Sequence, residues 1–313
     1  MNFAFVFPGQ GSQSMGMMNG YTELPIIRET FSEASDILGK DFWSMAKDGP
    51  NDDLNLTINT QPLMLIAGVA VYRAWINMGG EKPMYLAGHS LGEYTALVAS
   101  EALSFPEALS LVRFRAQVMQ EAVPEGVGGI AAILGLDDET IKMVCDEVIN
   151  DASGVSLAPA NFNSPGQVVI AGHKTAVLQG MTVAKAKGAK RAILLPMSIP
   201  SHCPLMMPAA QKMQQQLIQI KLVSPNIPVL HNVDVQQHNE TSAIKEILVK
   251  QLYSPVQWVN TVNALVANGV THVVECGPGK VLTGLNKRID RNLQNLSLAD
   301  SETMGQALKT LNH

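Results

Sequence analysis

The chain has 313 residues, of which 46% are hydrophobic and 16% are charged, with a net charge of −5. This composition predicts a large folded core, and it excludes both global disorder and a general attraction to nucleic acid. Three distant cysteines show neither zinc-site nor disulfide spacing, which favours a reducing compartment. The N-terminus lacks a signal-peptide pattern, and the apolar stretch 63–72 is too short to span a bilayer. We therefore expect a cytoplasmic protein without a metal or a nucleic-acid or membrane partner.

The first part of the chain, up to residue 124, alternates strand and helix patterns. The apolar run Phe3–Phe7 predicts a buried strand, and a glycine-rich loop follows it. Thr60 and Pro62 are typical of a helix start, with Thr60 as the expected cap. Helical patterns cover three segments of this part, at about 26–38, 61–78 and 106–122.

A G-x-S-x-G motif occupies residues 88–92 and has Ser90 at its centre. It lies between a short apolar run and a helix-like segment, 93–100, which is the context in which such a serine becomes a nucleophile. The flanking glycines allow a tight turn that also aims the N–H of Leu91 at an oxygen bound beside Ser90. The alternative is an ordinary glycine-flanked turn, because a motif with only three specified residues also occurs by chance.

Residues 127–197 follow a different order. Strands are expected at 130–134, 155–160, 167–171 and 191–195, and helices at 137–150 and 175–187. This βαββαβ order is the ferredoxin-like pattern. Afterwards the alternating pattern resumes, with helices at about 205–220, 244–251 and 256–268, strands at 229–233 and 270–276, and a final helix. The sequence thus predicts an α/β fold, in which a large α/β-hydrolase-like domain with a parallel sheet (1–126 and 198–313) contains a ferredoxin-like insertion (127–197). Ligand sites are common in the cleft between two such domains.

A serine hydroxyl needs a base to attack a carbonyl at neutral pH, and histidine is the usual base. His89 adjoins Ser90, but neighbouring side chains around a turn point apart. His202 lies among prolines in the loop 198–204, where the chain leaves the insertion, and such a rigid loop suits a base. A surface or core histidine remains the alternative for His202.

Four motifs occur in order along the chain, at 5–13, 88–94, 200–202 and 275–279. With the insertion, they make the whole chain resemble the malonyl-CoA:acyl carrier protein transacylases of bacterial fatty acid synthesis. The resemblance implies transfer of malonyl from malonyl-CoA to the phosphopantetheine thiol of acyl carrier protein, through an ester on Ser90 and without a cofactor. It also implies His202 as the base and the backbone carbonyl of Gln251 as its orienter. The backbone N–H groups of Gln10 and Leu91 would form the oxyanion hole.

Arg115 is the residue that the resemblance assigns to the malonyl carboxylate. An arginine grips a carboxylate through two parallel hydrogen bonds, and acetyl, which lacks that group, would leave it unpaired. From residue type alone, the alternative is that Arg115 lies on the surface and pairs with a neighbouring residue of its helix. Arg113 is the nearest competitor, but helix positions two apart face different directions. Glu93 is interpreted as a favourable charge near a helix start.

Coenzyme A and acyl carrier protein are both anionic, so a chain of net charge −5 must offer them a local positive surface. The candidates form two groups: Lys185, Lys187, Lys190 and Arg191, and Lys280, Lys287 and Arg288. We expect at least one group to steer the carrier, which would bind transiently to a monomer.

Other functions share parts of this pattern. An esterase or thioesterase would use the same serine and histidine, but G-x-S-x-G hydrolases usually place an acidic residue between them, where this chain has the insertion. A non-catalytic carrier-docking protein would not need Ser90, His202, Arg115 and Gln10 together. A polyketide synthase acyltransferase module is less expected, because no companion domain is seen in the sequence.

Overall fold

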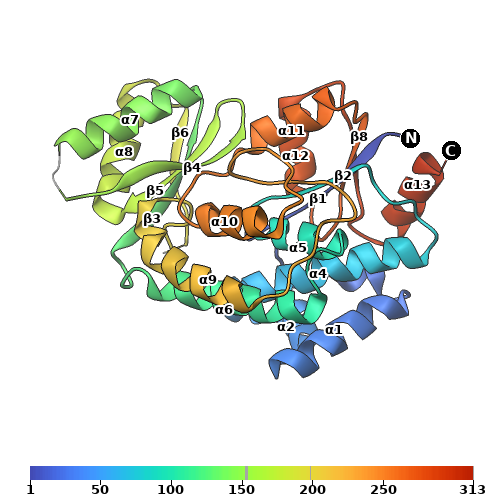
Figure 1. Cartoon of the computed structure of the whole chain (residues 1–313). Helices are drawn as coiled ribbons and strands as arrows, with labels where there is room; N and C mark the ends of the chain where they lie inside the picture. The colour runs from blue at the N-terminus through green and yellow to red at the C-terminus, as the bar shows by residue number, and fades with distance from the viewer. Residues whose placement is uncertain (152–153, 198, 313) are drawn as a thin grey trace.

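The computed structural model describes residues 1–151, 154–197 and 199–312, and it contains two separate sheets (Figure 1). In spatial order, the strands of the five-stranded sheet are β7 (Val229–Leu230), β2 (Tyr85–Gly88), β1 (Phe3–Phe7), β8 (His272–Glu275) and β9 (Gln294–Ser297). All of its pairings are parallel, which confirms the expected α/β class. The boundary expected at Ser198 lies outside the described residues.

Helices cover both faces of the parallel sheet. The α-helices described outside residues 127–197 are α1 (Pro25–Leu38), α2 (Phe42–Asp48), α3 (Asn51–Asn55), α4 (Thr57–Asn77), α5 (Gly92–Ala99), α6 (Phe105–Glu121), α9 (Met207–Gln219), α10 (Thr241–Gln251), α11 (Trp258–Ala267), α12 (Val281–Ile289) and α13 (Ser301–Leu311). The odd-numbered residues of β1 lie in a core with α4, α5 and α6, and the even-numbered ones lie in a second core with α11 and α12. Burial on both faces explains why β1 is apolar throughout.

The small sheet is antiparallel and stands beside the large one, in green and yellow in Figure 1. Its spatial order is β4 (Leu157–Ser164), β5 (Gln167–His173), β3 (Gly128–Leu134) and β6 (Arg191–Leu194). With α7 (Asp138–Asp151) and α8 (Lys174–Ala186), these strands follow the predicted βαββαβ order along the chain. Both helices pack on one face, whereas Ile130 and Val169 on the other face pack near Cys203, beside the predicted base.

Several local predictions were wrong. Helix α4 begins at Thr57, so Thr60 is not its cap: the Thr60 hydroxyl donates to the carbonyls of Leu54 and Leu56 instead of accepting from an N–H group. Pro62 lies inside the helix. The strand expected at 229–233 covers only two residues. Helices α2, α3 and α13 and strand β9 were not predicted.

Within the described residues, no helix is long and apolar enough to cross a membrane. The thiols of Cys145, Cys203 and Cys276 are all free and buried. Burial raises the pKa of the Cys145 and Cys203 thiols to about 12, so neither supplies a thiolate near neutral pH.

Candidate active site

Ser90 lies in a sharp turn between β2 and α5, as the motif predicts. A side chain on Gly88 would place its Cβ 1.9 Å from the carbonyl carbon of Gly92, and one on Gly92 would lie 2.0 Å from the Phe7 oxygen. Only glycine fits either position, because Gly88 lies against the backbone at the start of α5 and Gly92 lies against the end of β1. Ser90 itself has a φ of 51°, a conformation that costs a non-glycine residue about 1–3 kcal/mol.

The structure brings His202 to Ser90 from 112 residues away in the sequence, and their Oγ and Nε2 atoms lie 2.7 Å apart. On the other side of the ring, Nδ1 lies 2.7 Å from the backbone oxygen of Gln251. A carbonyl only accepts, so Nδ1 carries the proton and donates it there. The Nε2 lone pair therefore faces the serine hydroxyl, as a general base requires.

Burial keeps the imidazole of His202 neutral. Burial, and after it the nearby Arg115 cation, lower the pKa of His202 to about 3, although the hydrogen bond to the Gln251 carbonyl opposes both. The ring of His89 hydrogen-bonds to Asn163 of β4 at 2.8 Å. Burial lowers the pKa of His89 as well, so both rings are uncharged at neutral pH.

The loop that follows β1 brings Gln10 to the turn. A Cβ on Gly9 would lie 2.4 Å from the His89 oxygen and 3.6 Å from the Leu91 nitrogen, so only glycine allows this approach. Among the described residues, neither Gln10 nor Leu91 donates its backbone N–H to another group. Two free N–H donors beside a serine hydroxyl can stabilise an oxyanion formed there. The Gln10 side chain points elsewhere, accepting from the Thr57 hydroxyl at 3.0 Å.

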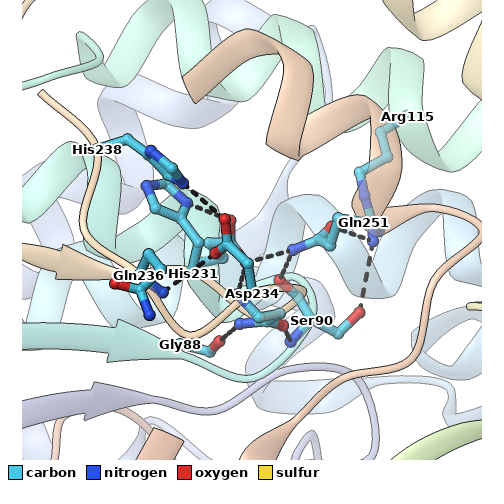
Figure 2. Close-up of polar contacts among 10 residues, drawn as sticks. Gly88, Ser90, Arg115, His231, Asp234, Gln236, His238 and Gln251 are labelled. Carbon is cyan, nitrogen blue, oxygen red and sulfur yellow. Dashed lines mark hydrogen bonds and ion pairs between the residues drawn. The ribbon is translucent and has the colours of Figure 1, made fainter. Parts of the chain in front are cut away.

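Arg115 extends from α6 into the same site and is only 1% exposed. Its Nη1 donates to the Gln61 side chain at 2.5 Å and its Nη2 to the Gln251 side chain at 3.0 Å. The same Nη2 lies 3.4 Å from the Ser90 hydroxyl oxygen (Figure 2). Burial lowers the pKa of Arg115, but a guanidinium stays protonated at neutral pH because its ordinary pKa is so high. Arg113, by contrast, is exposed and donates to the carbonyl of Leu38.

Sequence reasoning missed some side chains that support the site. Gln61 is part of the long apolar helix α4, and Asn232 follows the two-residue strand β7, so no local signal marked either of them. Glu93 was interpreted as a charge near a helix start, but it is fully buried and binds His231, Asn232 and Gln251. Its position directly after the G-x-S-x-G motif was the one available signal.

Two adjoining cavities lie over the site, between the two sheets. A small one surrounds Ser90, Arg115 and His202, and it shares Gln10 and Asn161 with a cavity of about 720 Å³. The larger cavity is lined by the loop 9–13, by β4 and β5 and by α12. Its size suits an extended small-molecule ligand.

This arrangement can be compared with known proteins. The acyl transferase domain model matches residues 4–304. The malonyl CoA-acyl carrier protein transacylase of Escherichia coli K12 is 52% identical over 308 residues, covering 98% of this chain and 99% of the relative. The crystal structure of acyl-carrier-protein S-malonyltransferase from Burkholderia pseudomallei is 54% identical, with a TM-score of 0.96, 99% of this chain covered and 100% of the other. A structure of a type II PKS acyl-carrier protein in complex with its malonyl-transacylase is 48% identical, with a TM-score of 0.97 and the same coverage.

Proposed function

We propose a function for this chain, which belongs to the malonyl-CoA:acyl carrier protein transacylase family of acyl transferases. It moves malonyl from coenzyme A to the phosphopantetheine thiol of acyl carrier protein. The observation that carries the proposal is the Ser90–His202 contact of 2.7 Å with a buried guanidinium 3.4 Å from the same hydroxyl oxygen. A nucleophile, a base and a carboxylate ligand then meet at one point.

In the first half-reaction, Ser90 Oγ attacks the thioester carbon of malonyl-CoA while His202 Nε2 accepts the hydroxyl proton. The negative charge that develops on the carbonyl oxygen is stabilised by the N–H groups of Gln10 and Leu91. When the carbon–sulfur bond breaks, the imidazolium returns its proton to the leaving sulfur. The products are free coenzyme A and a malonyl ester on Ser90.

The second half-reaction reverses these roles. His202 takes the proton from the phosphopantetheine thiol of the carrier, and the sulfur attacks the ester carbon. The same two N–H groups hold the oxyanion. As the ester bond breaks, the proton passes from His202 to Ser90 Oγ, which restores the free enzyme. Every step uses residues of the chain and the two thiols, so we expect no cofactor.

Arg115 selects the acyl group in this proposal. Each Nη atom carries two hydrogens. One on each is occupied by Gln61 or Gln251, and the second on Nη2 lies 3.4 Å from Ser90 Oγ as a contact that the substrate would replace. The remaining two can hold one carboxylate with parallel hydrogen bonds. Because Nη2 lies so close to Ser90 Oγ, the carboxylate must be near the ester carbonyl, which suits the single methylene of malonyl.

Mass spectrometry of the protein after brief mixing with malonyl-CoA tests the proposal. We expect a malonyl adduct that maps to Ser90, persists without the carrier and disappears when the carrier is added. Rapid release of free malonate without the carrier would instead indicate a thioesterase. Absence of any adduct would exclude the ester mechanism.

The low pKa of His202 predicts activity far into the acid range. Only the neutral imidazole accepts the serine proton, so kcat/KM should stay level from about pH 8 down to about pH 5. An ordinary imidazole would instead lose activity near pH 6.5. Burial also means that the folded protein binds fewer protons than the unfolded chain below that pH, so stability falls as the pH falls. Single-turnover malonylation measures the pH dependence of activity, and circular dichroism checks that the protein is folded at each pH. An acid limb of activity near pH 6.5 would contradict the prediction.

The carrier should approach along α12. Val281 and Leu285 of this helix line the large cavity, and Arg288, near its end, donates to Gln167 on the opposite rim. In the other cationic group, Lys187 is already paired with Glu147 at 2.9 Å. We therefore propose that Lys280, Lys287 and Arg288 steer the acidic carrier.

Replacing Lys287 and Arg288 by glutamate should raise KM for the carrier roughly tenfold at low salt. Transfer to free pantetheine, a small uncharged thiol, should keep its rate. The double reversal of Lys185 and Lys187 is the matched control. An unchanged carrier KM in the α12 variant would exclude this docking face.

We also expect the protein to act as a monomer in the cytoplasm. Light scattering would check the oligomeric state, and cell fractionation would check the location.

A further inference from the structure

The strained backbone of Ser90 is held on both sides by side chains from distant segments. Its N–H donates to the side-chain oxygen of Asn232 at 2.7 Å, and its carbonyl accepts from the side-chain nitrogen of Gln251 at 2.9 Å. The Asn232 side chain also donates to the carbonyl of Gly88 at 2.6 Å. Two amides therefore hold the turn that carries the nucleophile, and Figure 2 shows the Gln251 amide beside Ser90.

Both amides depend on one buried carboxylate. Glu93 accepts from the Gln251 side chain at 2.9 Å, from the Asn232 backbone N–H at 3.0 Å and from His231 Nδ1 at 2.7 Å. It is fully buried. The Asn232 and Gln251 groups are N–H donors, and His231 Nδ1 completes the set when it carries the ring proton, so an acceptor-only carboxylate fits the position.

The Gln251 amide also links Glu93 to Arg115. Its nitrogen faces the Glu93 carboxylate, and its oxygen accepts from Arg115 Nη2 at 3.0 Å. An amide held between an anion and a cation in this way has only one favourable orientation. Glu93 thereby reaches the carboxylate ligand as well as the nucleophile, although it contacts neither Ser90 Oγ nor His202 in the described structure.

We infer that Glu93 is a positioning residue, which holds Ser90 through Asn232 and Gln251 and holds Arg115 through Gln251. The inference rests on the proposed function, in which Ser90 is the nucleophile and Arg115 the carboxylate ligand. Strain at a catalytic turn persists only where the surrounding residues fix the backbone firmly. The Asn232 and Gln251 amides both hold the turn at Ser90, and both are bound to the Glu93 carboxylate.

Glu93→Gln tests the inference, because it replaces the anion that orients both amides by a neutral amide, whose NH₂ group meets a donor unless His231 Nδ1 becomes the acceptor. We expect kcat for malonyl transfer to fall by roughly tenfold or more. The rate at which a fluorophosphonate probe labels Ser90 should fall by a similar factor, while the acid limb set by His202 should not move. A purely structural role would lower the melting temperature and leave kcat and labelling unchanged, which would overturn the inference.

Glu275→Gln is the matched control. Glu275 is an equally buried carboxylate that accepts from the backbone N–H groups of Leu282 and Thr283, on β8 and away from Ser90. Its variant should lose stability but keep the labelling rate of Ser90. A loss of labelling equal to that of Glu93→Gln would mean that any buried carboxylate has this effect, and it would also overturn the inference.

If Glu93→Gln does not fold, Gln251→Leu takes its place, because it removes the bridging amide and keeps the backbone carbonyl that contacts His202. It should slow labelling of Ser90 and weaken discrimination between malonyl-CoA and acetyl-CoA, and unchanged values would refute the inference. The probe needs no malonyl group, so a failure of the proposed function is distinguishable: the wild-type protein would then label at Ser90 without transferring malonyl.

Discussion

Ser90→Ala is expected to form no malonyl adduct and to lose malonyl transfer by a factor on the order of 10⁶. The substitution removes the only atom that forms the ester and leaves the turn, the oxyanion donors and Arg115 in place. Residual activity can then come only from binding and from stabilisation of the oxyanion. Stopped-flow release of coenzyme A and mass spectrometry of the intact protein measure the two effects separately.

The same variant should remain folded, because Ser90 Oγ contributes only its contacts with His202 and Arg115. Malonyl-CoA should still bind, since the cavity and the guanidinium are unchanged. Ser100→Ala is the matched control: Ser100 is buried at the C-terminal end of α5, the helix that follows Ser90, and its hydroxyl donates to the Leu97 carbonyl, away from the site. Transfer by Ser90→Ala above about a hundredth of the wild-type rate would place the nucleophile elsewhere.

Features that depend on neighbouring residues could be predicted from the sequence. The turn at Ser90 needs glycines two positions away on each side, and the structure shows why, because both are packed against the backbone. The βαββαβ order of the insertion follows from the periodicity of its apolar residues. Short elements such as α3 and β9 could not be predicted, because they carry too few residues to establish a period.

The distant partners of Ser90 were beyond any spacing rule. His202 was one candidate base from its loop, with a surface or core histidine as the alternative, and Gln251 was named only because the chain resembles a known family. The structure places His202 beside Ser90 and the Gln251 carbonyl beside His202. Asn232 follows a two-residue strand and resembles an ordinary loop residue in the sequence. The burial of Glu93 could not be deduced either, because a glutamate in the first turn of a helix is usually solvated.

Arg115→Ala is expected to reverse the choice of acyl group. Without the guanidinium, the malonyl carboxylate would enter a buried site with no cation to pair with, and kcat/KM for malonyl-CoA should fall by roughly 10³-fold or more. Acetyl-CoA makes no such demand, so its kcat/KM should change little. The substitution also frees the Gln61 and Gln251 amides, and these lost hydrogen bonds should lower the melting temperature.

Two further variants separate charge from geometry. Arg115→Lys keeps the cation but loses the planar pair of donors, so its preference for malonyl should be intermediate. Arg113→Ala removes an exposed arginine of the same helix that donates to the Leu38 carbonyl, so both substrates should keep their wild-type rates. Competition between malonyl-CoA and acetyl-CoA, followed by mass spectrometry of the acylated protein, measures the preference directly. An equal loss for both substrates in Arg115→Ala would mean that Arg115 supports the fold of the site and does not recognise the carboxylate.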